Sequence, residues 1–118
     1  MPPDGFLALA RELLALPEAG ERHWRGAAIA AHQAVHHAVA AALGLDPTTF
    51  AGNPRAVREA LMLVDPAAAV PLLVRARRHL ATLWLTRLRA EQALAEPFQE
   101  LDARLAVAHA DAVLASGI

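Results

Sequence analysis

Apolar residues recur every three or four positions along most of the chain, the spacing that places them on one face of a helix. Alanine, leucine and arginine dominate, β-branched residues are sparse, and the prolines fall between the periodic segments. The pattern predicts helices over residues 5–16, 21–43, 54–64, 66–95 and 97–115. We therefore expect an all-α, antiparallel, up-and-down bundle of four to five helices, in a single domain over residues 1–118, with the Ala-rich helix 21–43 at its centre.

Residues that favour helix ends support these boundaries. Asp4 is a candidate cap for the first helix, and Gly44 is a natural left-handed end for the second. Asn53 followed by Pro54 predicts the start of the third helix, and Asp65 followed by Pro66 repeats that signal for the fourth. Between the second and third helices, LDPTTFAGNP over residues 45–54 forms the longest predicted irregular stretch.

The two C-terminal helices each carry an apolar stripe that predicts a buried face. In helix 66–95 the stripe consists of Val70, Leu73, Val74, Leu80, Ala81, Trp84, Leu85 and Leu88. In helix 97–115 it consists of Phe98, Leu101, Leu105, Ala108 and Ala112.

Composition narrows the class of protein. The net charge is −1 and all 11 basic residues are arginine, so non-specific nucleic-acid binding is disfavoured, although a local arginine patch could bind RNA. The absence of cysteine excludes disulfides, thiolate catalysis and cysteine-ligated zinc. No signal-peptide pattern and no long apolar run is present, so we expect a cytoplasmic protein that does not enter a membrane. We expect no cofactor and no serine or tyrosine chemistry, because tyrosine is absent and Ser116 is the one serine.

Three ionisable residues share one stripe of helix 21–43. At about 100° per residue, Arg25, His32 and His36 fall within roughly 40° of one another. The spacing of the two histidines suits a metal, but a third ligand would have to come from His79, His109 or an acid elsewhere. Alternatively, His32 transfers protons beside Arg25, or all three residues lie in the core or at a dimer interface.

Helix 66–95 carries a basic strip opposite its leucines. Arg75, Arg78 and Arg89 lie on it, together with His79, Thr82 and Thr86. The strip could follow the phosphates of RNA, meet an acidic partner or form a solvated face. No aromatic residue interleaves with the arginines to stack bases.

A second arginine and histidine pair lies on the last predicted helix. Arg104 and His109 have four residues between them and are separated by about 140° around an ideal helix. Glu100, one turn before Arg104, can form an ordinary surface ion pair with it.

Taken together, AAHQAVHHAVAAALGLDP, the short Asn-Pro helix, ARRHLATLWLTRLRAE and FQELDARLAVAHADAVLA resemble the HEPN superfamily of small helical bundles. The resemblance covers most of the chain. Its most specific part is helix 21–43, where Gln33, Ala34, Ala38 and Leu43, followed by Gly44, look like the family's core pattern. By this resemblance Gln33 belongs to the core or to an interface.

The resemblance implies a dimeric bundle, often encoded beside a nucleotidyltransferase-fold partner and in many members a metal-independent toxin RNase. Arg104 and His109 match the spacing of the active members' Arg-x4-6-His motif, but Leu105 stands where those members carry a polar residue. We therefore expect a homodimeric partner-binding or regulatory module of a toxin–antitoxin or nucleotidyltransferase system. The alternatives are an RNase that uses Arg104 and His109 for catalysis, with RNA held by Arg75 and Arg78, and a metal protein that uses His32 and His36.

Overall fold

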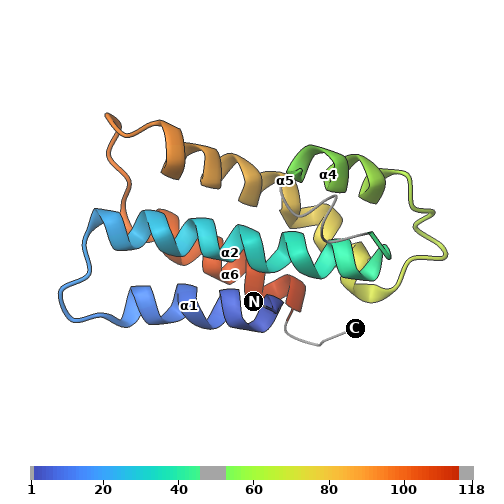
Figure 1. Cartoon of the computed structure of the whole chain (residues 1–118), viewed down its shortest axis with the longest axis horizontal. Coiled ribbons are helices and arrows are strands. Elements are labelled where there is room, and N and C mark those ends of the chain that lie inside the picture. Colours follow the sequence, from blue (N-terminus) through green and yellow to red (C-terminus); the bar gives the residue numbers. More distant parts are fainter. Residues whose placement is uncertain (1, 46–52, 115–118) are drawn as a thin grey trace.

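Helices make up the regular structure of residues 2–45 and 53–114, the parts of the chain that the computed structural model describes. In chain order they are α1 (Pro3–Ala15), α2 (Glu21–Ala42), α4 (Pro54–Met62), α5 (Pro71–Gln92) and α6 (Glu100–Leu114) (Figure 1). Within these ranges there is no strand, so the all-α prediction is confirmed there. None of these helices is long and apolar enough to span a membrane. Most of the predicted 45–54 connection and the predicted helix end at residue 115 lie outside the described ranges.

The alanine-rich α2 is the central helix of the bundle, as its composition predicts. Alone among the described helices it contacts all of the others, and α1 runs alongside it over much of its length (Figure 1). Small side chains let neighbouring helices approach its backbone closely from several sides. Its buried alanines are Ala27, Ala28, Ala30, Ala31, Ala34, Ala38 and Ala40.

Two of the predicted helix-end signals are confirmed. The Asn53 side chain accepts a hydrogen bond of 3.1 Å from the Ala56 N–H at the start of α4, with Pro54 as the first helical residue. Gly44 ends α2 with a φ of +70°, which glycine adopts without steric cost. The N–H of Gly44 and that of Leu45 turn back to carbonyls in the last turn of α2, completing the capping motif that this glycine allows.

Two other predicted helix starts are wrong. Asp4 lies inside the first turn of α1, whose N-cap is Pro2 without a side-chain hydrogen bond. Asp65 closes a local turn by accepting from the Ala67 N–H at 3.0 Å, and α5 begins at Pro71 rather than at residue 66. Proline needs no partner for its missing N–H at a first helical position, so Pro71 is a suitable first residue for α5.

The predicted buried stripe of α6 is also wrong, apart from Phe98, which precedes the helix and is buried. Leu101 and Leu105 are 63% and 49% exposed, and Ala108 and Ala112 face solvent as well. The helix buries its opposite face instead, which consists of Ala103, Ala106, Ala110 and Val113. The face with small residues is buried because it lets α6 pack closely against the alanine-rich surface of α2. Bulky leucines at this contact would keep the two helices further apart.

The helix α5 likewise buries a different face from the predicted stripe. It does bury Leu73 and Leu80, but Val74 and Leu85 are exposed. The rest of its buried face consists of Leu72, Ala76, Leu83 and Ala90. Part of the reason is that three α5 arginines, Arg75, Arg77 and Arg87, reach acceptors on other helices. These contacts favour one rotation of α5 about its axis.

Arg25 holds the C-terminal end of α5 and is itself 8% exposed. Its guanidinium donates to four backbone carbonyls, those of Arg89, Ala90, Ala93 and Glu96. These carbonyls come from the last turn of α5 and the connection to α6, where helical partners run out. A buried cation at this position satisfies the orphan acceptors and also complements the negative end of the helix dipole.

Glu21, one turn before Arg25 on α2, completes the same junction. Its Oε1 lies 3.3 Å from Arg25 Nη2 and accepts a 2.6 Å hydrogen bond from the Phe98 N–H. This backbone hydrogen bond is the main cause of the lowered pKa of Glu21. Arg25 also lies over the Phe98 ring, 5.3 Å from its centroid. The first two turns of α2 thus clamp the whole α5–α6 connection.

Two further arginines on α5 serve other helix ends. Arg77 donates to the carbonyls of Leu61, Met62 and Val64 at the end of α4. Arg75 donates from Nε to the Val113 carbonyl at the end of α6, at 2.9 Å. The described ends of α4, α5 and α6 are therefore each bound by an arginine from another helix.

Replacing Arg25 with Met is expected to lower the free energy of unfolding by about 2–4 kcal/mol, because it leaves buried carbonyls of the α5–α6 junction without a donor. Arg25→Lys keeps the charge but not the planar fork and should lose less. Urea denaturation measures both losses. The matched control is Arg22→Met on an exposed position of the same helix, expected within about 0.5 kcal/mol of wild type. A loss below 1 kcal/mol for Arg25→Met would contradict the capping role.

Candidate functional site

A stack of rings runs from the surface into the bundle between α4, α5 and α2. Arg58 of α4 lies over the Trp84 ring of α5, 5.0 Å from its centroid. Trp84 in turn packs against His32 of α2, with ring centroids 5.3 Å apart. His32 and His36 follow at 5.7 Å, and they are 0% and 2% exposed. The cluster joins the short helix α4 to the core through consecutive ring contacts.

His32 is held neutral by its surroundings. Arg87 Nη1 lies 3.1 Å from His32 Nδ1, and because a guanidinium can only donate, Nδ1 must accept and the proton resides on Nε2. Burial, followed by the nearby positive charge of Arg87, lowers the pKa of His32 to about 3. The Nε2 proton finds no hydrogen-bond acceptor within the described ranges. His32 is therefore an uncharged core side chain at neutral pH.

The same contacts bear on the metal hypothesis for His32 and His36. The Nδ1 lone pair of His32 is already engaged by Arg87, and Arg58 adds further positive charge near the ring. Over the described residues, no group of three or more candidate ligands gathers around any point. A cation bound at this pair would have to displace Arg87 from His32 and would be repelled by both arginines.

The remaining residues of the predicted α2 cluster have structural contacts. Arg25 is bound to the end of α5, about two helical turns from His32 along α2. Gln33 is half-buried on the same helix. His37, which follows His36, stacks face to face on Phe6 of α1, with ring centroids 5.0 Å apart.

Arg104 and His109 have separate partners on α6. Arg104 Nη2 pairs with Glu100 at 2.9 Å on the exposed surface, the ion pair that the sequence spacing predicts. The His109 ring lies against His79 of α5, with centroids 4.9 Å apart. Burial, then the proximity of His109 and Arg78, lowers the pKa of His79. The structure thus brings two half-buried imidazoles together at the seam between α5 and α6, with Arg104 on another side of α6.

The three arginines of the predicted basic strip differ in their surroundings. Arg75 donates to the end of α6, and Arg89 pairs with Asp102 at 3.2 Å. Arg89 also lies over the Phe98 ring, 5.4 Å from its centroid. Arg78 is exposed beside His79. Two of the three are therefore engaged within the fold, which leaves a weaker positive surface than the sequence pattern suggests.

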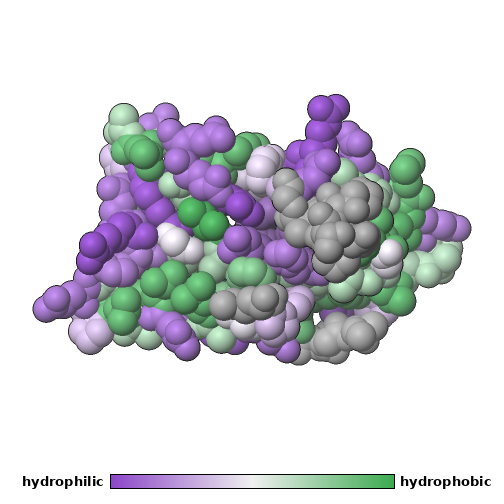
Figure 2. All heavy atoms as spheres, viewed as in Figure 1, coloured by the Kyte–Doolittle hydropathy of each residue, from purple (hydrophilic) through white to green (hydrophobic). Residues whose placement is uncertain are grey.

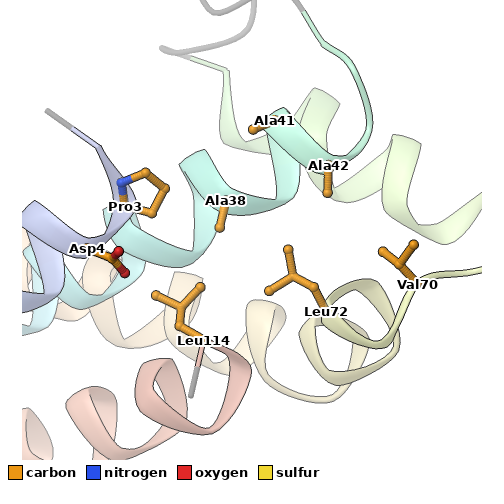
Figure 3. A pocket seen from close by; sticks show the side chains of 8 residues that line it. All are labelled: Pro3, Asp4, Ala38, Ala41, Ala42, Val70, Leu72 and Leu114. Atoms are coloured by element: carbon orange, nitrogen blue, oxygen red, sulfur yellow. The ribbon is translucent and has the colours of Figure 1, made fainter. Parts of the chain in front are cut away.

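An open apolar pocket of about 470 Å³ lies where the start of α1, the end of α2, the start of α5 and the end of α6 meet (Figure 3). One charged side chain, Asp4, borders it among otherwise aliphatic residues. The lining consists of Pro3, Asp4, Ala38, Ala41, Ala42, Val70, Leu72 and Leu114. Such a pocket suits an apolar group better than a nucleotide or a sugar.

The outer face of α6 is an exposed apolar ridge formed by Leu101, Leu105, Ala108 and Ala112, called here the α6 ridge. These residues recur at i, i+4, i+7 and i+11, so they line up along one side of the helix. On the face seen in Figure 2, by comparison, apolar residues form a band over α1 and hydrophilic residues dominate over α5. A continuous apolar ridge on a helix that already buries its other face is typical of a binding surface.

Comparison of the chain with models of known families, with curated proteins and with solved structures finds no match to any of them.

Sequence reasoning missed the contacts that cross between helices. The pairing of Arg87 with His32 and that of His79 with His109 depend on how α5 packs against α2 and α6. One available signal was that Arg87 lies on the same side of α5 as the buried Leu80 and Leu83, one or two turns away. An arginine on a buried face implies an acceptor inside the bundle.

The neutral state of His32 predicts acid sensitivity. An unfolded histidine protonates near pH 6.5 and the folded His32 only near pH 3, so the unfolded chain binds this proton first as the pH falls. The contribution of neutral His32 to the free energy of unfolding is fully present above pH 6.5 and is lost progressively as the pH falls to about 3. Between pH 7 and 5 it should fall by about 2 kcal/mol, measured by urea denaturation.

The control for this effect is His32→Gln, whose amide oxygen can still accept from Arg87 but cannot titrate. The free energy of unfolding of His32→Gln should decline less steeply with falling pH than that of the wild type. The difference in slope should correspond to about one proton bound on unfolding. Equal slopes for the two proteins would show that His32 does not carry the acid sensitivity.

Proposed function

We propose that this protein is a protein-binding module, an HEPN-type antiparallel up-and-down bundle that acts as a regulatory partner in a toxin–antitoxin or nucleotidyltransferase system. The observation that carries the proposal is the α6 ridge, a row of apolar side chains on the side of α6 that the bundle does not bury. Burial of two exposed leucines against a partner is worth roughly 2–4 kcal/mol of binding free energy, enough to make the ridge a determinant of affinity.

The charged residues support binding rather than catalysis. Three α5 arginines are engaged in the fold through Val113, Leu61 and His32, and Arg104 is paired with Glu100. A phosphate or RNA chain would have to compete with these contacts. The family resemblance makes a nucleotidyltransferase-fold protein the expected partner.

The test is coexpression of this chain with the product of the adjacent gene, followed by size-exclusion chromatography with light scattering and a titration by calorimetry. We expect a stable complex with wild type. Leu101→Gln combined with Leu105→Gln should weaken binding at least tenfold, because it makes the ridge polar.

The matched control is Leu63→Gln combined with Leu94→Gln, two leucines that are 86% and 69% exposed and lie outside the ridge. This variant should bind like wild type. The proposal fails if no complex forms, or if both double variants weaken binding equally.

The RNase alternative rests on a different observation, the pairing of His109 with His79 beside Arg78 at the α5–α6 seam. One imidazole could accept a proton from a 2′-hydroxyl while the other donates to the leaving oxygen. Incubation with a mixed RNA pool in the presence of EDTA tests it. We expect the wild type to leave the RNA intact. If the wild type cleaves RNA and His109→Ala does not, the RNase function is favoured over the binding function.

A further inference from the structure

The apolar pocket at the end of the bundle forms because α2 still carries alanines where its neighbours begin or end. Ala38 is 8% exposed, and Ala42, one turn further along α2, is exposed. At this level α1 and α5 begin and α6 ends (Figure 3). The short alanine side chains cannot fill the space between these helix ends, so a pocket of about 470 Å³ is left open.

The pocket has an apolar floor and a charged edge. Leu72 of α5 is 5% exposed and points toward Ala38 and Ala42 of α2 (Figure 3). Asp4, in the first turn of α1, is exposed and lies at the edge. Among the described residues that line the pocket, it is the one polar or charged side chain. A ligand that fits must therefore be apolar over most of its surface, with one polar group at the edge.

The carboxylate of Asp4 decides which charge that polar group carries. The Asp4 side chain forms no hydrogen bond or ion pair with any residue of the described ranges. Arg75, one turn after Leu72 on α5, is bound to the Val113 carbonyl and does not line the pocket. The negative charge of Asp4 thus has no cationic partner in these ranges. It attracts a cationic group and repels an anionic one.

We propose that this pocket binds a small aliphatic amine, with its ammonium group beside Asp4 and its hydrocarbon part against Leu72, Leu114 and the alanines of α2. The site goes beyond the proposed protein-binding function and is separate from the α6 ridge, because no ridge residue lines it. Pockets that hold small molecules typically have volumes of about 300–1,000 Å³. With about 470 Å³, this pocket suits a short alkyl chain.

The position of the charge favours a free amine over a lysine side chain of another protein. The ammonium group of a free amine stays in water at the edge, where Asp4 lies, while the alkyl tail enters the pocket. A lysine side chain enters with its ammonium group first. Its charge would then lie on the apolar floor at Leu72 and Ala38, where no described side chain can pair with it.

Methyl NMR titrations of the whole chain test the pocket with three probes that share a six-carbon chain: n-hexylammonium, 1-hexanol and hexanoate, each up to about 10 mM. Hexylammonium should bind about threefold more tightly than hexanol, the gain expected from one solvent-exposed ion pair. Hexanoate should bind more weakly than hexanol. The largest shifts should occur at the methyl groups of Ala38, Leu72 and Leu114.

n-Butylammonium should bind about tenfold more weakly than n-hexylammonium, because it buries two fewer methylene groups. The inference is overturned if hexanoate binds as tightly as hexylammonium. It is also overturned if hexylammonium leaves the methyl groups of the pocket unshifted.

Asp4→Asn tests the charge at the edge, because it keeps the size of the side chain. This variant should bind hexanol as wild type does, and hexylammonium should lose its threefold advantage over hexanol. The matched control is Glu12→Gln, which removes an exposed carboxylate about two turns further along α1 and should keep the advantage. An advantage that survives Asp4→Asn, or that both variants lose equally, overturns the role of Asp4.

Ala42→Leu tests the location of the ligand. Ala42 points into the pocket and is exposed in the last turn of α2, so a leucine there occupies the pocket without entering the core (Figure 3). It should weaken the binding of hexylammonium and hexanol alike, at least fivefold, with unchanged helix content by circular dichroism. Ala81→Leu, the same substitution at an exposed position of α5 outside the pocket, should bind like wild type. Wild-type binding by Ala42→Leu would place the ligand elsewhere and overturn the site.

Discussion

The bundle depends on supplying hydrogen-bond donors to helix ends that terminate against other helices. The last carbonyls of a helix have no helical partner, and burying them without a donor costs on the order of 1–3 kcal/mol each. This chain has no lysine, and it meets the demand with arginines that reach across from neighbouring helices. Arg25 holds the end of α5, Arg77 the end of α4 and Arg75 the end of α6. A planar guanidinium suits this task because it reaches several carbonyls at once.

These arginine contacts determine how α5 is rotated in the bundle. Arg75 and Arg77 reach acceptors at the ends of α6 and α4, and Arg87 reaches His32. With three arginines directed inward, the buried apolar positions of α5 shift to the side that carries Leu72, Ala76 and Leu83, and Leu85 is left in solvent. The same contacts occupy donor groups of Arg75, Arg77 and Arg87 with acceptors inside the fold. Of the three arginines in the basic strip, Arg75 binds a helix end, whereas Arg78 and Arg89 remain exposed.

The use of alanine on α2 has a second consequence, at α6. An alanine-rich partner surface selects small residues for close packing, so α6 turns Ala103, Ala106 and Ala110 inward and leaves its leucines outside. The apolar side chains on the other side of α6, among them Leu101 and Leu105, then remain exposed. The close packing of α6 against α2 and the exposure of the α6 ridge therefore have the same cause.

The helical class, the central place of α2 and several helix ends can be predicted from the sequence. These features follow from local rules: alanine content, Asn53 before Pro54, and a glycine free to adopt the positive φ of Gly44. Which face of α5 and α6 is buried was decided only in the tertiary structure. Both helices carry apolar residues on more than one side, and the choice depends on the shape of α2 and on where the arginines find acceptors. The pairings of His32 with Arg87 and of His109 with His79 join residues far apart in the chain, so helical periodicity, which orders side chains within one helix only, carries no information about them.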